Sequence, residues 1–283
     1  MLRIPMFFAF IQVTFALSTA DTVVQIPVGA LLKARAVTTL TDGKLVTWTM
    51  GIDGNGGGDG YLTQAASTFH GDKNIKALPD DALIPADARH PAIQLHYANE
   101  DGVGNQTRDM HGADSFTVPL PPAVYSKVFL IFTSSEGSST LTFTLTYADS
   151  TATKTVELPD YFNVIAAGDA NCFNLVNDLA KWSKTNAVAE NNHHFVDGVE
   201  LHPAGRVLKS IKVAKTAKAY VVFWGATGIA TGTVSARLPQ AAPRAAGASS
   251  PLRAARYRLR MAGSFPASVG PAVSAVGRAL PGG

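Results

Sequence analysis

Residues 140–147 alternate strictly between threonine and larger apolar side chains. Successive side chains of a β-strand point to opposite faces, so Leu141, Phe143, Leu145 and Tyr147 would share one face. Threonine also favours strands, because its branched β-carbon packs well on a pleated surface. The run therefore predicts a strand with one buried face and one face in water.

The neighbouring run, residues 128–132, is apolar on both faces, as expected for a strand in the middle of a sandwich. Residues 134–139 between the two runs have the composition of a turn. This order predicts an antiparallel hairpin that pairs residues 125–133 with residues 140–147.

Turn signals separate further short apolar or alternating runs along the chain. These runs predict strands at 22–28, 45–50, 92–97, 116–120, 152–158, 207–213 and 219–226. Leu175, Val176, Leu179 and Trp182 recur at helical spacing, so residues 171–184 predict one short helix, with Asn171 or Asn174 as its cap. The predicted fold class is therefore all-β: an antiparallel β-sandwich, of the jelly-roll kind, with one short helix.

The two ends of the chain differ in composition from the predicted sandwich at 21–234. Residues 4–17 are apolar and residues 18–20 are small, which predicts a secretory signal peptide at 1–20; an N-terminal anchor is the alternative. A secreted protein without stable membrane insertion is expected. Residues 235–283 are rich in Ala, Pro and Arg, which predicts a disordered tail.

Charge is distributed unevenly along the chain. Residues 1–200 hold 12 of the 24 Lys and Arg and all 21 Asp and Glu, so the basic residues that remain follow residue 200. The basic tail is either a product of a shifted reading frame or an arm that binds polyanions. No nucleic-acid partner is expected. The lone Cys172 excludes an intramolecular disulfide and suits a small buried side chain.

A segment rich in glycine and aspartate spans residues 53–60. Asp53, Asn55 and Asp59 supply oxygen ligands at alternate positions, as a calcium-binding loop does. The position of the bidentate glutamate of an EF-hand is held by Gln64. A structural Ca²⁺ at these residues and a plain flexible loop both remain open. Asn105 begins an N-glycosylation sequon.

The order of these segments resembles the galactose-binding-like jelly-roll domains that accompany many secreted glycoside hydrolases and lectin-like proteins. The matching segments are 53–60, 116–121, 125–130, 141–149, 158–161, 209–213 and 219–227. Such domains often carry an acid–tryptophan pair after the central strands, where this chain has Asp160 and Tyr161. The resemblance implies carbohydrate binding, often with a structural Ca²⁺, but fixes no binding residue.

A sugar site needs aromatic surfaces and fixed polar groups. The candidates in predicted loops or at strand ends are Tyr61, Tyr97, Asp101, Arg108, Asp109, Tyr161 and Trp182. Trp48 and Trp224 lie in apolar runs and are assigned to the core. His193 and His194 are adjacent, and on a regular strand they would face opposite ways, which argues against one shared metal ion.

Three functions follow from these observations. The first is a secreted, non-catalytic protein that binds extracellular or cell-wall glycans. The second is a glycan-active hydrolase or lyase on the same scaffold, which would need two carboxylates across a cleft. The third is a structural or adhesive surface protein. No G-x-S-x-G motif is present, so the usual serine esterase turn is missing.

Overall fold

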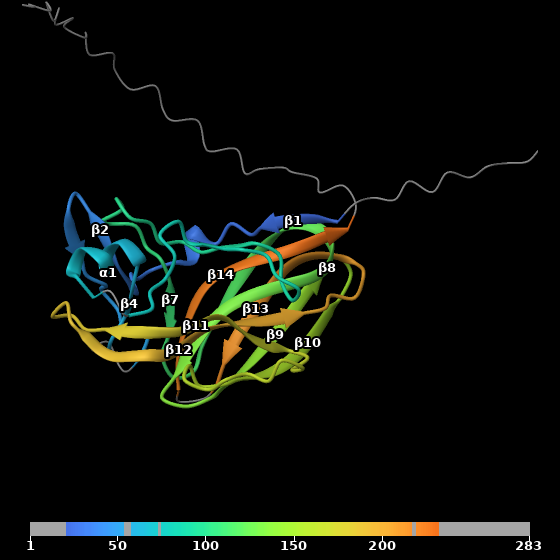
Figure 1. The fold of residues 1–283 in the computed structure, drawn as a ribbon. Coiled ribbons are helices and arrows are strands. Elements are labelled where there is room, and N and C mark those ends of the chain that lie inside the picture. Colours follow the sequence, from blue (N-terminus) through green and yellow to red (C-terminus); the bar gives the residue numbers. More distant parts are fainter. Residues whose placement is uncertain (1–20, 54–57, 73–74, 217–218, 232–283) are drawn as a thin grey trace, which may run out of the picture. The chain divides into compact units, whose positions relative to one another are not determined.

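Strand β8 (Asp114–Ser135) is the longest element and belongs to both layers of the fold (Figure 1). Its first part pairs with β13 (Val207–Lys215). Its second part lies between β14 (Tyr220–Thr231) and β12 (Val188–Leu201).

The computed structural model describes residues 21–53, 58–72, 75–216 and 219–231. The predictions for the signal peptide at 1–20 and the tail at 235–283 fall outside these residues.

The main sheet has nine strands, and every pairing within it is antiparallel. Its path runs β1–β14–β8–β13–β9–β10, with β11 and β12 branching from β8 and β7 pairing with β14. The strands not yet bounded are β1 (Thr22–Gln25), β7 (Arg108–Met110), β9 (Ser139–Tyr147), β10 (Thr151–Leu158) and β11 (Cys172–Trp182). The prediction of an all-β antiparallel sandwich is confirmed.

Two smaller sheets lie in the N-terminal part of the chain. Strands β3, β2 and β4 form one sheet, and β5 and β6 form the other. Their bounds are β2 (Val37–Thr41), β3 (Lys44–Val46), β4 (Tyr61–Leu62), β5 (Leu83–Ile84) and β6 (Ile93–Gln94). A 3₁₀ turn, η1, spans Gly29–Leu31.

The first hydrophobic core fills the space between the two layers. Phe143 on β9, Ile211 on β13 and Phe132 on β8 are all fully buried in it. The alternation predicted for residues 140–147 is confirmed, because Leu141, Phe143, Leu145 and Tyr147 are buried and the threonines between them are more exposed.

A second core lies on the opposite face of the β14–β8–β12–β11 layer. Phe129 and Ile131 of β8 and Trp224 of β14 meet Tyr61 and Ile93 there. Residues 128–132 are thus buried on both faces, as their composition predicts. The N-terminal segments of the protein cover this face and so place their loops beside β11 and β12 (Figure 1).

The predicted hairpin between 125–133 and 140–147 is wrong. β13 lies between β8 and β9, and β9 forms its hairpin with β10 instead. Glu136 and Gly137 take positive φ values of 60° and 112°, and the chain crosses there from one layer to the other. The turn composition of residues 134–139 suits this crossing as well as a hairpin. Pro119, Pro121 and Pro122 lie inside β8, close to where it exchanges β13 for β14.

The predicted helix at 171–184 is also wrong, since Cys172–Trp182 form the strand β11. Four register irregularities interrupt its pairing with β12, and Asp178 has a φ of 58°. Bulges add residues to one strand and change which side chains face the core. Leu175, Leu179 and Trp182 are therefore all buried although their spacing is not that of a regular strand.

The α-helix among the described residues is α1 (Gln64–His70). Thr63 caps it by accepting a hydrogen bond of 3.2 Å from the backbone N–H of Ala66. Gly71 ends it with a φ of 94°, a left-handed conformation that glycine adopts without strain. Both signals are present in the sequence, but seven residues are too few to show a helical period.

Candidate functional site

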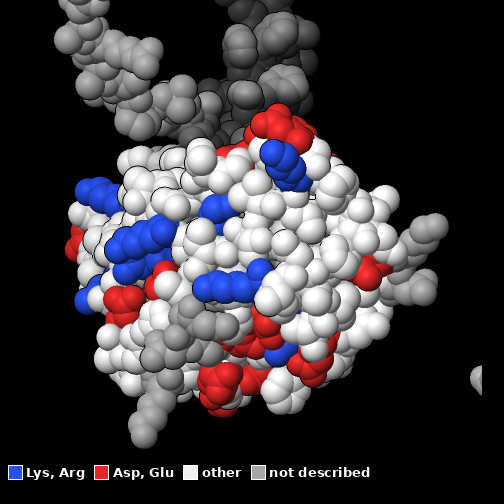
Figure 2. Space-filling model, turned by 90° about the vertical axis from the view of Figure 1, so that its left-hand side faces the viewer, with Lys and Arg blue, Asp and Glu red and all other residues white. Residues whose placement is uncertain are grey.

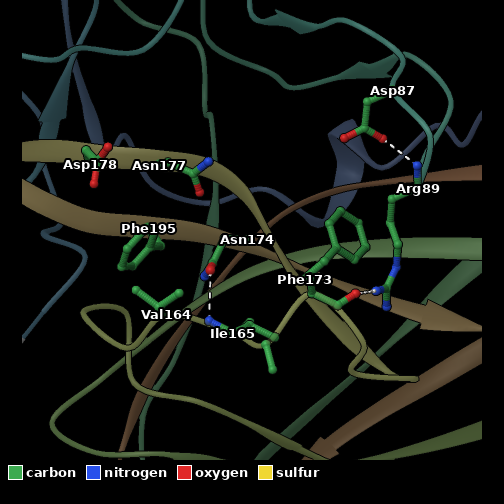
Figure 3. A pocket seen from close by; sticks show the side chains of 11 residues that line it. Asp87, Arg89, Val164, Ile165, Phe173, Asn174, Asn177, Asp178 and Phe195 are labelled. Carbon is green, nitrogen blue, oxygen red and sulfur yellow. Dashed lines mark hydrogen bonds between the residues drawn. The ribbon is translucent and has the colours of Figure 1, made fainter.

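A pocket of about 480 Å³ opens beside β11 and β12. Its walls come from the loop that precedes β6, the connection from β10 to β11, and the two strands themselves (Figure 3). The lining residues are Asp87, Arg89, Val164, Ile165, Ala166, Ala167, Phe173, Asn174, Asn177, Asp178 and Phe195.

The pocket has an apolar base and a polar rim. Phe173 and Phe195 are buried, with 7 % and 5 % of their surface exposed. Asn177 is exposed, and the side chain of Asp178 is 45 % exposed. Figure 3 shows Asn174, Asn177 and Phe195 on one side of the opening, with Asp87 and Arg89 on another. Polar groups thus surround a surface that can hold an apolar face of a ligand.

Asn174 fixes the wall that the β10–β11 connection forms. Its Oδ1 accepts a hydrogen bond of 2.9 Å from the backbone N–H of Ile165. Its Nδ2 donates at 2.8 Å to Asp197 Oδ1 on β12. The amide therefore ties the connection to the sheet, so the wall is formed before any ligand arrives.

Arg89 holds the other wall. Its guanidinium donates to the carbonyl oxygens of Asp169 at 2.6 Å and Cys172 at 3.2 Å, and to Glu200 Oε2 at 3.2 Å. It also lies 5.2 Å from the centre of the Phe173 ring. Because these contacts use much of its hydrogen-bond donor capacity, the main role of Arg89 is to hold the pocket wall in place, and it has few donors left for a ligand.

Asp87 is exposed at the rim, where its Oδ1 accepts hydrogen bonds from the backbone N–H groups of Arg89 at 2.7 Å and His90 at 2.9 Å. Burial alone would raise the pKa of Asp87, but these two hydrogen bonds and the nearby His90 and Arg89 charges lower it. The carboxylate is therefore an acceptor at neutral pH.

A second polar cluster surrounds Lys181 on β11. Lys181 Nζ lies 2.8 Å from Asp53 Oδ2, 3.0 Å from Glu190 Oε2 and 3.7 Å from Asp59 Oδ2. Burial by itself lowers the pKa of Lys181, but hydrogen bonds to Asp53, Glu190 and Tyr161 raise it above its ordinary value. Asp53 and Asp59, two of the predicted calcium ligands, are thus brought together around a lysine. Asn55 lies outside the described residues.

The four aromatic residues predicted to bind sugar are buried. Tyr61, Tyr97, Tyr161 and Trp182 have between 0 % and 6 % of their surface exposed. Tyr61 donates to the carbonyl of Phe195 at 3.1 Å, and Tyr161 donates to Asp53 at 3.0 Å. In this structure these rings belong to the core and its polar cluster, and they do not line the pocket. Trp48 and Trp224 are buried as predicted.

The predicted polar candidates have other partners. Asp101 accepts from the backbone N–H groups of Val103 and Gly104, and lies 3.9 Å from Arg35. Arg108 lies 3.5 Å from Asp114, and Asp109 lies 3.0 Å from His111. The amide of Asn105 donates to the carbonyl of Leu32 at 3.2 Å. The structure brings none of these residues to the pocket.

Sequence reasoning missed the pocket residues, and no motif could have found them. Asn177 and Phe195 come from strands that pair through bulges, and Asp87 comes from a loop more than 70 residues earlier.

The face that Figure 2 shows carries Lys and Arg interspersed with Asp and Glu among uncharged residues, so neither sign dominates it.

No protein-family model matches the chain, and comparison with curated proteins finds no significant match. Within the described part of the chain, no helix has the length and apolar character that crossing a membrane requires.

Proposed function

We propose that the protein is a secreted, non-catalytic, carbohydrate-binding β-sandwich of the galactose-binding-like kind, and that the pocket beside β11 and β12 holds the sugar. The observation that carries the proposal is the pairing of an apolar base, Phe173 and Phe195, with exposed polar groups at its rim. A sugar ring has an apolar face and a periphery of hydroxyl groups, and this arrangement offers a surface to each.

Asn177 and Asp87 are the residues proposed to form hydrogen bonds with the hydroxyl groups of the sugar. An amide both donates and accepts, while an ionised carboxylate only accepts, so the two could distinguish hydroxyl orientations. The walls that Asn174 and Arg89 hold are formed in advance, which lowers the entropy lost when a ligand binds.

A polysaccharide pull-down and a glycan array test this proposal. Wild-type protein is expected to be retained on at least one polymer. Asn177→Ala is expected to bind it about 5–10-fold more weakly, because the loss of one hydrogen bond costs about 1–1.4 kcal/mol. Thr153→Ala, an exposed change on β10 away from the pocket lining, is the control and should bind as wild type does. Retention on no polymer, or equal binding by Asn177→Ala, would contradict the proposal.

A glycan-active hydrolase on the same scaffold is the second candidate, because two carboxylates, Asp87 and Asp178, line the same pocket. Incubation with a panel of polysaccharides would release products from wild type in that case, and Asp178→Asn would abolish the release. Binding without product release favours the first proposal.

A further inference from the structure

His193 and His194 on β12 lie side by side, with ring centres 4.2 Å apart. The sequence argument that they would face opposite ways is wrong because β12 is irregular here. Two residues of β11, Leu179 and Lys181, pair with His194 and Glu190, so β12 has two extra residues between those partners. Asn192, which lies between Glu190 and His194 in the sequence, has a φ of 37°. The bulge turns both rings to the same carboxylate.

That carboxylate belongs to Glu190. His193 Nε2 lies 2.8 Å from Glu190 Oε1, and His194 Nε2 lies 3.3 Å from Glu190 Oε2. The nearest ligand atoms of the three residues all lie within 4.8 Å of one another. In a tetrahedral site with bonds of about 2.0–2.2 Å, ligand atoms stand roughly 3.3 Å apart. The present distances therefore need only small side-chain shifts, and half-exposed His193 is free to make one.

The other ring nitrogens already have partners. His193 Nδ1 lies 2.6 Å from the carbonyl oxygen of Asn191, and His194 Nδ1 lies 3.1 Å from that of Leu179. A carbonyl can only accept, so each Nδ1 carries a hydrogen. Each Nε2 faces a Glu190 carboxylate oxygen, so a metal ion would take the Nε2 lone pair by displacing the proton that is shared with Glu190. Metal-binding histidines are held in this way, with Nδ1–H bonded to a carbonyl and Nε2 free for the ion.

The charge around Glu190 also favours a cation. Three carboxylates, Asp53, Asp59 and Glu190, lie within 4 Å of the single ammonium of Lys181. When His193 and His194 are neutral, the formal charges in this group do not balance, because the three carboxylates outnumber the ammonium. Lys181 holds Glu190 Oε2 at 3.0 Å, which orients the carboxylate and leaves Oε1 beside His193.

We propose that Glu190, His193 and His194 form a binding site for Zn²⁺ or a similar divalent transition-metal ion. Two imidazoles and one carboxylate suit Zn²⁺, whereas Ca²⁺ takes oxygen ligands. Glu190 and His193 are 44 % and 51 % exposed, so the remaining coordination position faces solvent. This site is separate from the pocket residues of the proposed sugar site, and each proposal can fail without the other.

The test is metal uptake by the full chain after treatment with a chelator. Isothermal titration with Zn²⁺ is expected to show one saturable site in wild type, and Ca²⁺ should not compete. His193→Ala and Glu190→Gln change exposed side chains and remove direct ligands, so each should weaken binding by more than the roughly 10–100-fold that loss of an outer-shell partner causes. Replacement of Zn²⁺ by Co²⁺ should give a visible absorption spectrum, which reports coordination directly.

His202→Ala is the matched control. His202 is 55 % exposed, and its Nε2 lies 3.2 Å from Glu200 Oε1, so it forms a histidine–carboxylate pair outside the cluster of three. This variant should bind Zn²⁺ as wild type does. The proposal is overturned if wild type shows no saturable uptake, which would leave Glu190 as an ordinary partner of protonated histidines. Equal affinities for His193→Ala and His202→Ala would overturn it as well.

Discussion

Asn174 Nδ2 donates a hydrogen bond of 2.8 Å to Asp197 Oδ1, yet Asp197 Oδ2 is buried with no hydrogen-bond partner among the described residues. Burial raises the pKa of Asp197 to about 8, against the opposing effect of the Asn174 hydrogen bond, and the neighbouring Asp160 adds to the rise. The pocket wall is thus tied to a carboxyl group that keeps its proton in neutral solution.

This pKa makes stability depend on pH. The unfolded carboxyl releases its proton near pH 4, whereas the folded one holds it to about pH 8. The folded state binds more protons between these values, so the free energy of unfolding falls as pH rises through that window. Asp197→Asn removes the ionisation and should flatten this fall. Urea denaturation at pH 5, 6, 7 and 8 measures it.

Asp149→Asn provides the comparison, since its side chain is 67 % exposed on a turn. That variant should follow the wild-type pH profile. If Asp197→Asn lost stability with pH as steeply as wild type, the buried carboxyl would not be the group responsible.

Lys181→Met should destabilise the protein strongly. The Lys181 side chain is only 12 % exposed and neutralises Asp53, which is 11 % exposed, so its loss leaves a buried carboxylate without its closest counter-charge. Breaking a buried ion pair from one side costs about 3–5 kcal/mol. A drop in the free energy of unfolding of this size, measured by chemical denaturation at pH 7, is expected.

The control for that change is Lys76→Met. Lys76 is also bonded to an aspartate, Asp178, at 2.7 Å, but the two side chains are 58 % and 45 % exposed. Exposed pairs contribute about 0–1 kcal/mol, so this variant should be nearly as stable as wild type. If both variants lost a similar free energy of unfolding, the buried ion pairs of Lys181 would contribute no more to stability than an exposed pair does.

The sequence predicts the fold well where one physical rule decides the outcome. In residues 140–147 a single face must be buried, and strict alternation admits one solution. The same reasoning fails at residues 172–182, because bulges change the strand period and bury both Leu179 and Trp182, whose spacing of three is helical. Pairing partners are also invisible locally, as the insertion of β13 between β8 and β9 shows.

The candidate site was much harder to predict. Tyr61 and Trp182 lie near glycines and polar residues in the sequence, but long-range packing of β4 against β11 buries both. The pocket residues and the cluster around Glu190 come together only after the loops and bulges are placed. A sequence pattern reports periodicity, and it does not report which distant segment covers a side chain.

Phe143→Ala should create a cavity in the first core. Phe143 is fully buried between the layers and lies near Phe132, with ring centres 6.2 Å apart. Removing a buried phenyl ring costs about 3–5 kcal/mol. Thr144→Ala on the other face of β9 should change the free energy of unfolding by about 0.5 kcal/mol or less. Thermal and urea denaturation of the pair measure the difference, and equal losses would refute the assignment of the two faces.

Gly60→Ala should disturb the contact between β4 and the end of β11. Gly60 exchanges two backbone hydrogen bonds with Trp182, of 2.8 and 2.7 Å. A Cβ at Gly60 would lie 2.7 Å from the carbonyl oxygen of Ala36 and would also meet the Trp48 ring, so backbone must shift. Overpacking of this kind costs about 1–3 kcal/mol.

Gly29→Ala is the control, because a Cβ there has no atom within 4 Å and should change stability by less than about 0.5 kcal/mol. Near-ultraviolet circular dichroism should report the disturbed tryptophans in Gly60→Ala alone, and an unchanged spectrum with unchanged stability would show that this close approach does not constrain the fold.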